Sequence, residues 1–390
     1  MAAEQVLDLS VPPPTGPMHA GTGTVWENMR GLPTPYRDQE LYDAVTTAGF
    51  NEYPERYENL QRYNRAQRGE VVDYLPIQMD IENVSRCNFR CTMCQVSKWH
   101  KGKRSRDMTL QEFKDLVEQQ FGLIEIKLQG MGEPLLAGDV FFEMIRYARE
   151  RHIWVRTTVN GSLLHLNDNY KKLIDSDVCE VHISIDAPTK ETFEAIRHGS
   201  KFERVTKNAR LLNDYAKSVG KHRTRMWGVV QRSMFHALDQ MPKLAADLGF
   251  ARLSLSLDLN DWGQDTWREF NDTQDMQDAF DLDTAHRLRA CGEELGVEVT
   301  FFSLDEKFDT SSPETLCHWP FERLYIASDM RVVPCCMIAN PDVMEIGSAY
   351  DIGAMWNSQV MRDFRGAHLS GAIPDICKSC YKHGGGSAGE

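Results

Sequence analysis

The sequence predicts an α/β protein: a partial (β/α)6 barrel of TIM-like architecture, with a helical extension before it and a small cysteine-rich module after it. From about residue 74, six apolar strand-like runs alternate with amphipathic helix-like runs. Tandem strand–helix units of this kind form parallel strands joined by right-handed crossovers. The module is defined by a separate observation, because five of the ten cysteines lie between residues 317 and 380.

Composition and charge limit the function classes. The chain has 390 residues, and 57 acidic against 44 basic side chains give a net charge of −13. Such a chain repels phosphates, so we expect no nucleic-acid partner. No apolar run reaches the roughly 18–20 residues of a membrane span, and the N-terminus lacks the basic and apolar regions of a secretion signal. We therefore expect a cytoplasmic protein without a membrane partner, whose cysteines are metal ligands or catalytic thiols rather than disulfides.

Residues 1–73 form the predicted N-terminal extension. Its first 20 residues are rich in Pro, Gly and Ala, which predicts a mobile segment. Residues 38–69 predict two short helices with a break near Gly49 and Pro54.

Residues 74–303 form the predicted barrel, and we expect its chemistry at the C-terminal edge of the strands. The last strand-like run of this region is VEVTFFS, near residue 300. Residues 304–383 form the predicted cysteine module, and residues 384–390 a flexible tail. The six strand-like runs of the barrel are LPIQMDIEN, LIEIKLQG, IWVRTTVNG, CEVHISID, RMWGVVQ and ARLSLSLDL.

The first cysteine group, Cys87, Cys91 and Cys94, directly follows the first barrel strand with C-x3-C-x2-C spacing. Three thiolates in so short a segment can converge on one four-iron cluster and leave its fourth iron open to a non-protein ligand. A zinc site would need a fourth ligand nearby, and His100 is the candidate, beyond a basic stretch.

This spacing after the first strand of a partial barrel resembles the signature of radical S-adenosylmethionine (SAM) enzymes. The resemblance implies that the open iron of a [4Fe-4S] cluster binds SAM. One electron then cleaves SAM, and the resulting 5′-deoxyadenosyl radical abstracts a substrate hydrogen. It also implies an external one-electron reductant of flavodoxin or ferredoxin type.

Further elements at successive strand ends match the same family in its order. Gly130-Met131-Gly132-Glu133-Pro134 is similar to the family's Gly-Gly-Glu-Pro element, although a Met replaces a Gly and an ordinary turn is the alternative. Thr158-Val159-Asn160-Gly161 and Ser184-Ile185-Asp186 end the next two strands. For Gln231, a generic polar strand end is the alternative reading. The resemblance implies SAM contacts by Met93, Gly130, Met131, Gly132, Glu133, Asn160, Ser184, Asp186, Arg197 and Gln231.

The second cysteine group consists of Cys317, Cys335, Cys377 and Cys380. Four thiolates would ligate every iron of a second [4Fe-4S] cluster, and a structural zinc is the alternative that spacing leaves open. The segment resembles the SPASM module or its shorter twitch form. The resemblance extends to a hairpin turn at Ser328-Asp329, followed by a Met where the family has Gly, and it implies one auxiliary cluster.

Three cysteines remain outside both groups. Cys179 and Cys291 are expected to be small buried side chains in a strand and a helix. Cys336 follows a predicted ligand directly. It is either a buried thiol or the candidate catalytic residue, a hydrogen-atom donor of the kind that an epimerase needs.

A saturated cluster near the substrate can accept an electron, so the expected reaction is an oxidation. The arrangement resembles radical SAM dehydrogenases of aminocyclitol and aminoglycoside antibiotic biosynthesis. It implies an oxidoreductase that converts a carbinol carbon of a sugar, aminocyclitol or aminoglycoside to a ketone. The alternatives are a redox-neutral epimerase or dehydratase acting on a sugar, a radical SAM enzyme that modifies a ribosomal peptide, and a non-catalytic iron–sulfur or zinc protein.

An acidic segment bears on the substrate. Residues 258–283 hold nine carboxylates and one base, and they follow the sixth strand on the expected active-site face. A carboxylate-lined opening would attract a cationic small molecule. The candidate substrate contacts nearest the strand end are Asp258, Asp261 and Trp262. The alternative is a solvated acidic loop and helix N-terminus.

Overall fold

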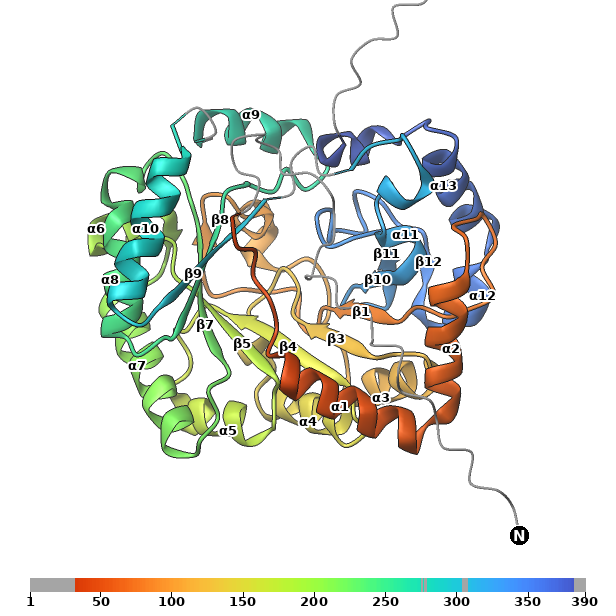
Figure 1. Cartoon of the computed structure of the whole chain (residues 1–390), viewed down its shortest axis with the longest axis horizontal. Helices are drawn as coiled ribbons and strands as arrows, with labels where there is room; N and C mark the ends of the chain where they lie inside the picture. The colour runs from red at the N-terminus through yellow and green to blue at the C-terminus, as the bar shows by residue number, and fades with distance from the viewer. Residues whose placement is uncertain (1–31, 275, 277–278, 304–307, 382–390) are drawn as a thin grey trace, which may run out of the picture.

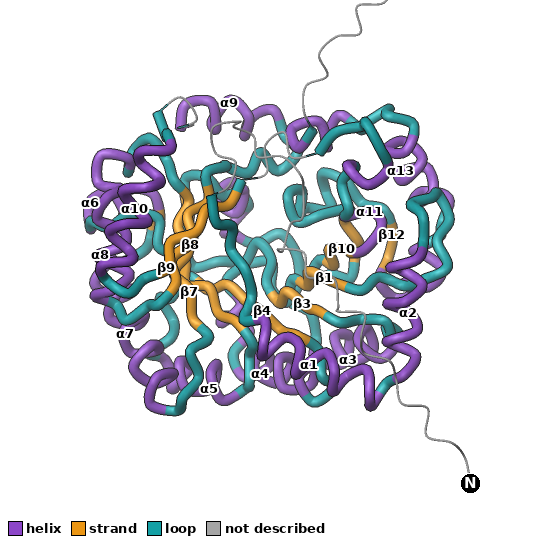
Figure 2. Tube along the Cα trace, in the orientation of Figure 1, coloured by secondary structure: helices purple, strands orange, loops and turns teal. Residues whose placement is uncertain are grey.

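The computed structural model describes residues 32–274, 276, 279–303 and 308–381. Ten strands form one curved sheet in the centre of the molecule, and helices surround it (Figure 1). Figure 2 shows the same arrangement as a tube coloured by secondary structure. The sheet order is β12-β11-β10-β1-β3-β4-β5-β7-β8-β9. The segments predicted to be mobile, residues 1–20 and 384–390, lie outside the described residues.

Seven parallel strands form the barrel part of the sheet, and the mostly parallel α/β architecture predicted from the sequence is confirmed. The six predicted runs and VEVTFFS each contain one of them. Their side chains are largely buried because helices cover the outer face, as is usual for parallel strands. The strands are β1 (Gln78–Ile81), β3 (Glu125–Leu128), β4 (Trp154–Val159), β5 (Glu180–Ser184), β7 (Thr224–Val229), β8 (Arg252–Ser256) and β9 (Glu298–Phe302).

Amphipathic helices cover the outer face. In α4 (Asp139–Arg149), for example, the buried residues Phe141, Phe142, Met144, Ile145 and Ala148 recur at helical spacing and pack on the strands. The other covering helices are α3 (Leu110–Glu118), α5 (Asn169–Asp175), α6 (Lys190–Ile196), α7 (Phe202–Ser218), α8 (Met241–Asp247) and α10 (Leu282–Glu294). Helix α9 (Asp265–Gln274) instead follows the C-terminal end of β8, where Arg268 and Asn271 line a cavity.

Two N-terminal helices close the end of the barrel opposite the strand C-termini. They are α1 (Gln39–Glu52) and α2 (Pro54–Arg65), and the chain breaks between them at Tyr53. Gly49 lies inside α1, three residues before its end, and its missing side chain leaves room for Arg56, whose Nη1 would lie 2.7 Å from a Cβ there. The cluster that buries both helices is Tyr42, Val45, Phe50, Leu60, Ile77, Ile124, Trp154 and Cys179.

The C-terminal module extends the barrel sheet directly. Strand β10 (Arg323–Ile326) pairs in parallel with β1, and then β11 (Arg331–Val333) and β12 (Gly347–Ser348) continue antiparallel. The hairpin turn contains Met330, whose φ of 69° keeps the left-handed backbone that Gly usually supplies. The module's helices are α11 (Trp319–Glu322), α12 (Ile352–Trp356) and α13 (Gln359–Leu369).

Candidate active site

A cavity of about 370 Å³, which we call the chamber, lies at the C-terminal ends of the barrel strands. This is the edge where parallel barrels carry their chemistry. Cys87, Cys91 and Cys94 line it together, so the structure brings the first cysteine group to one site. A two-stranded sheet of β2 (Arg90–Cys91) and β6 (Arg197–His198) joins the cysteine loop to the arginine predicted to contact SAM.

The cysteine loop is suited to hold an iron–sulfur cluster. The Phe89 backbone N–H donates a hydrogen bond to Cys87 Sγ at 3.4 Å, and Asn160 Nδ2 lies 4.0 Å from the same sulfur. Burial raises the pKa of Cys87 to about 12. Iron binding would therefore supply the positive charge that ionises these thiols.

The segment Gly130–Gly132, just after β3, lines the chamber with backbone that carries no side chain at its two glycines. A Cβ on Gly132 would lie 2.3 Å from the Val84 carbonyl oxygen, and one on Gly130 would lie 2.3 Å from the Glu82 side chain, so both positions require glycine. Met131, which stands where the family has Gly, donates its backbone N–H to Glu82 Oε1 at 3.1 Å. All three residues line the chamber.

Glu133 carries a buried carboxylate oxygen that faces a ligand site. Its Oε2 accepts a hydrogen bond from the Asn160 backbone N–H at 2.8 Å, whereas the buried Oε1 has no hydrogen-bond partner in the described structure. Burial raises the pKa of Glu133 to about 7. A buried carboxylate oxygen of this kind needs a donor, and the ammonium group of SAM fits it.

The predicted SAM residues fall into two sets. Met93, Asn160, Ser184 and Arg197 line the chamber, together with the strand end just described. Asp186 and Gln231 are buried behind it, outside its lining.

The two buried residues hold members of the first set. Asp186 Oδ2 accepts a hydrogen bond from Arg197 Nε at 2.6 Å, and Gln231 Nε2 lies 4.0 Å from Met93 Sδ. Burial lowers the pKa of Arg197, but the nearby Asp186 carboxylate raises it, and the net effect is an increase. The guanidinium therefore stays charged and can bind an anionic group such as the carboxylate of SAM.

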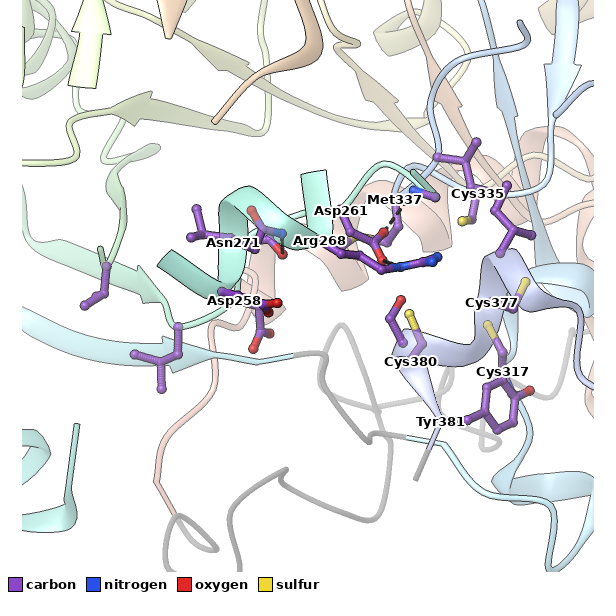
Figure 3. Close-up of a pocket in the computed structure, with 18 residues that line it drawn as sticks. Asp258, Asp261, Arg268, Asn271, Cys317, Cys335, Met337, Cys377, Cys380 and Tyr381 are labelled. Atoms are coloured by element: carbon purple, nitrogen blue, oxygen red, sulfur yellow. Dashed lines mark hydrogen bonds and ion pairs between the residues drawn. The ribbon is translucent and has the colours of Figure 1, made fainter. Parts of the chain in front are cut away.

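The second cysteine group meets in a neighbouring cavity of about 320 Å³, the auxiliary cavity. Figure 3 shows the four side chains directed toward a common space. Tyr381 anchors it, because its hydroxyl accepts a hydrogen bond from the Cys317 backbone N–H at 2.8 Å. The cysteines that line it are Cys317, Cys335, Cys377 and Cys380.

Cys335 and Cys336 face different cavities although they are adjacent in the chain. Cys335 lines the auxiliary cavity, Cys336 lines the chamber, and the next residue, Met337, lines both. Asp258 and Leu259 also belong to both linings, so the two cavities share a wall. Cys336 therefore lies on the substrate side of this wall.

The acidic segment is largely engaged in local contacts. Asp261 pairs with Arg268 at 2.9 Å, and Asp281 accepts a hydrogen bond from the Thr284 backbone N–H at 2.8 Å as the N-cap of α10. Asp258 accepts a hydrogen bond from Ser303 Oγ at 3.0 Å. These contacts favour the alternative of a solvated loop and helix cap over a free cation-binding surface. The remaining acids include Asp275 and Asp278, which lie outside the described residues.

The predicted substrate contacts divide between the cavities. Asp258 lines both, whereas Asp261 lines the auxiliary cavity only. Trp262 lines the chamber, and its Nε1 donates a hydrogen bond to the Met93 carbonyl oxygen at 3.2 Å. It thus lies beside Met93, one of the residues that the resemblance implies as SAM contacts.

Sequence reasoning missed a ring of polar and aromatic side chains inside the barrel. Lys127 Nζ lies 3.5 Å from Asp80, and Arg156 Nε donates a hydrogen bond to Glu125 at 2.8 Å. Their signal was present, because parallel barrel strands are normally apolar and these runs carry charges at their centres. The chamber residues of this ring are Asp80, Lys127, Arg156, His182, Trp227, Phe302, Trp319 and Arg323.

A barrel with three cysteines at its strand ends and a fused four-cysteine module defines an iron–sulfur enzyme. Comparison with protein families agrees with this class. Residues 82–230 match the Radical SAM superfamily, and residues 317–381 match SPASM, an iron–sulfur cluster-binding domain. The chain contains a Radical SAM domain and a SPASM domain, and these domains imply [4Fe-4S] clusters and SAM as its cofactors.

Individual relatives support the same assignment. The mycofactocin maturase MftC of Mycobacterium tuberculosis is 26% identical over 313 residues, which cover 78% of this chain and 75% of the relative. The MftC of Mycolicibacterium smegmatis is 28% identical over 205 residues, 52% of this chain, and the match spans only half of that relative.

Solved structures show a similar fold. Streptococcus suis SuiB, crystallised with its precursor peptide SuiA, is 16% identical with a TM-score of 0.57, and the match covers 80% of this chain and 69% of SuiB. In the described part of the chain, no helix is both long enough and apolar enough to cross a bilayer.

Proposed function

We propose that this enzyme modifies a peptide, by abstracting a hydrogen atom from one residue that inserts into the chamber. The observation that carries this proposal is the alignment with a mycofactocin maturase over 78% of the chain. A related fold that binds a precursor peptide adds support. The chamber of about 370 Å³ contains the residues predicted to hold the cluster and SAM, together with the polar ring of the barrel that would face a substrate residue.

The chain's own residues define how such a substrate would be held. SAM, bound at the open iron, would supply the hydrogen-abstracting radical. Glu133 and the backbone of Gly130 and Gly132 would hold SAM at one wall of the chamber, and Trp262 lies beside Met93 at the same chamber. On the barrel side, Lys127, which lies 3.5 Å from its partner Asp80, would meet an anionic group of the substrate.

A second candidate is the oxidation of a carbinol carbon of a sugar, aminocyclitol or aminoglycoside. The shared wall between the chamber and the auxiliary cavity supports it. A cluster held by the four cysteines would lie beside the chamber, where it could accept one electron from a substrate radical. The local pairing of Asp261 and the cationic Lys127 in the chamber argue against a polycationic substrate. A neutral sugar remains compatible with both features.

The orientation of Cys336 raises a redox-neutral variant of either reaction. Its thiol lines the chamber and could return a hydrogen atom to a substrate radical. Product mass separates these chemistries: oxidation removes two hydrogens, whereas a redox-neutral reaction keeps the mass and, in D2O, adds one deuterium from an exchanged thiol.

The experiment that tests the proposal is anaerobic turnover of the reconstituted enzyme with two matched panels, analysed by mass spectrometry. One panel holds precursor peptides encoded beside the gene, and the other holds aminoglycosides and activated sugars. We expect modification in the peptide panel. Modification of a sugar, with all peptides unchanged, would refute the peptide proposal and support the second candidate.

A further inference from the structure

An exposed basic surface lies on the outside of the first cysteine loop. Residues 98–106 contain five Lys or Arg and no Asp or Glu, in a chain with a net charge of −13. The two arginines of this segment pair with carboxylates. Lys98, Lys101 and Lys103 are exposed and have no ion pair with any other described residue. We call these three lysines the basic surface.

Backbone hydrogen bonds hold the basic surface against the cysteine ligands. The Cys87 N–H donates to the Gly102 carbonyl oxygen at 3.2 Å, and the Ser97 N–H donates to the Cys94 carbonyl oxygen at 3.0 Å. Lys101 and Gly102 both adopt left-handed backbone, with φ of 54° and 63°, and this turn folds the segment back onto the loop. Each lysine is therefore one residue from a backbone group bonded to a cysteine of the first group.

We propose that the basic surface docks an acidic one-electron carrier protein of the flavodoxin or ferredoxin class. A radical SAM enzyme requires one electron for each SAM that it cleaves. In the docked complex the carrier would give up one electron to the cluster held by Cys87, Cys91 and Cys94, and that electron would cleave a carbon–sulfur bond of SAM to give methionine and a 5′-deoxyadenosyl radical. The surface lies directly outside these cysteines, so docking there gives the carrier a short approach to the electron's entry point.

Charge complementarity supports this choice of partner. An acidic protein of net charge −13 repels an acidic carrier, and a local group of lysines without ion pairs to described residues gives such a carrier an attractive approach. Rim charges of this kind act mainly on association rate and on salt dependence. The inference depends on the radical SAM chemistry of the domain and is independent of the peptide substrate, so either proposal can fail without the other.

The test compares two triple charge reversals that change the net charge equally. One is Lys98→Glu, Lys101→Glu and Lys103→Glu. The control reverses Lys207, Lys217 and Lys243, which are also exposed but lie on α7 and α8. Calorimetry measures binding of an oxidised bacterial flavodoxin, and stopped-flow absorbance measures reduction of the reconstituted enzyme by reduced flavodoxin or by dithionite.

We expect the basic-surface variant to bind flavodoxin about tenfold or more weakly at low salt, with a smaller salt dependence. Its reduction by flavodoxin should slow similarly, whereas its reduction by dithionite and its iron content should match the wild type. Equal losses in the control variant would overturn the inference, since net charge alone would explain them. An unchanged flavodoxin affinity, or tight binding of an acidic peptide at the same lysines, would also overturn it.

Discussion

Replacement of Glu133 by glutamine separates the cost of a buried carboxylate from its use in binding SAM. Burial raises the pKa of this carboxyl from 4.5 to about 7. That difference corresponds to about 3 kcal/mol of unfolding free energy. Because the pKa is raised in the folded state, the ionised form opposes folding, and the penalty grows from pH 4.5 to pH 7 and is complete above pH 7.

Glu133→Gln removes this penalty and keeps an oxygen that can accept the Asn160 N–H. We therefore expect the metal-free variant to be more stable than the wild type by up to about 3 kcal/mol at pH 8, with the difference vanishing near pH 4.5. Urea unfolding at several pH values measures this. Glu143→Gln, the same change on an exposed helical residue, is the control and should be neutral.

SAM binding should respond in the opposite direction. The variant loses a charge-assisted hydrogen bond to the SAM ammonium, so cluster-loaded Glu133→Gln should bind SAM about tenfold to a hundredfold more weakly at pH 8. Wild-type affinity should fall below pH 7 as the carboxylate gains a proton, whereas that of the variant should not. A variant with wild-type SAM affinity, or one less stable than the wild type at pH 8, would refute the reasoning.

Three further predictions address other parts of the site. Cys335→Ala should lower the iron content of the reconstituted protein from about eight to about four per chain, whereas Cys336→Ala should keep about eight. Equal iron loss in both variants would contradict the assignment of Cys335 to the auxiliary cavity and Cys336 to the chamber. Gly132→Ala should cost about 1–3 kcal/mol of stability and abolish SAM binding measured by equilibrium dialysis, whereas Gly353→Ala, where a Cβ has ordinary space, should not. Lys127→Met should reduce turnover of the peptide substrate without changing substrate-free SAM cleavage, and a parallel loss of both would show that Lys127 acts on SAM instead.

The sequence predicts those features whose signal is local. Strand-like runs separated by amphipathic helices define the seven parallel strands, because periodicity reports which face of each element is buried. The first cysteine site is also predictable from local sequence, because Cys87, Cys91 and Cys94 all lie in one loop. The four cysteines of the second site are distant in sequence, so their grouping depended on the resemblance to the SPASM or twitch module and not on their spacing.

Features that depend on long-range packing were beyond the sequence. Nothing local indicates that β10 would pair with β1 and so extend the barrel sheet. The opposite orientations of Cys335 and Cys336 follow from the wall between two cavities, which exists only in the folded protein. Asp186 matches a family position predicted to contact SAM, but its Oδ2 already accepts a hydrogen bond from Arg197 Nε.

Cys87, Cys91 and Cys94 should together support reductive cleavage of SAM at the chamber. The most direct measurement is chromatographic detection of 5′-deoxyadenosine in anaerobic mixtures of reconstituted protein, SAM and dithionite, beside a Cys94→Ala variant. The wild type should produce 5′-deoxyadenosine only when dithionite is present, and the variant should produce none. Intact SAM after reduction of the fully loaded wild type, or equal cleavage by the variant, would contradict the claim.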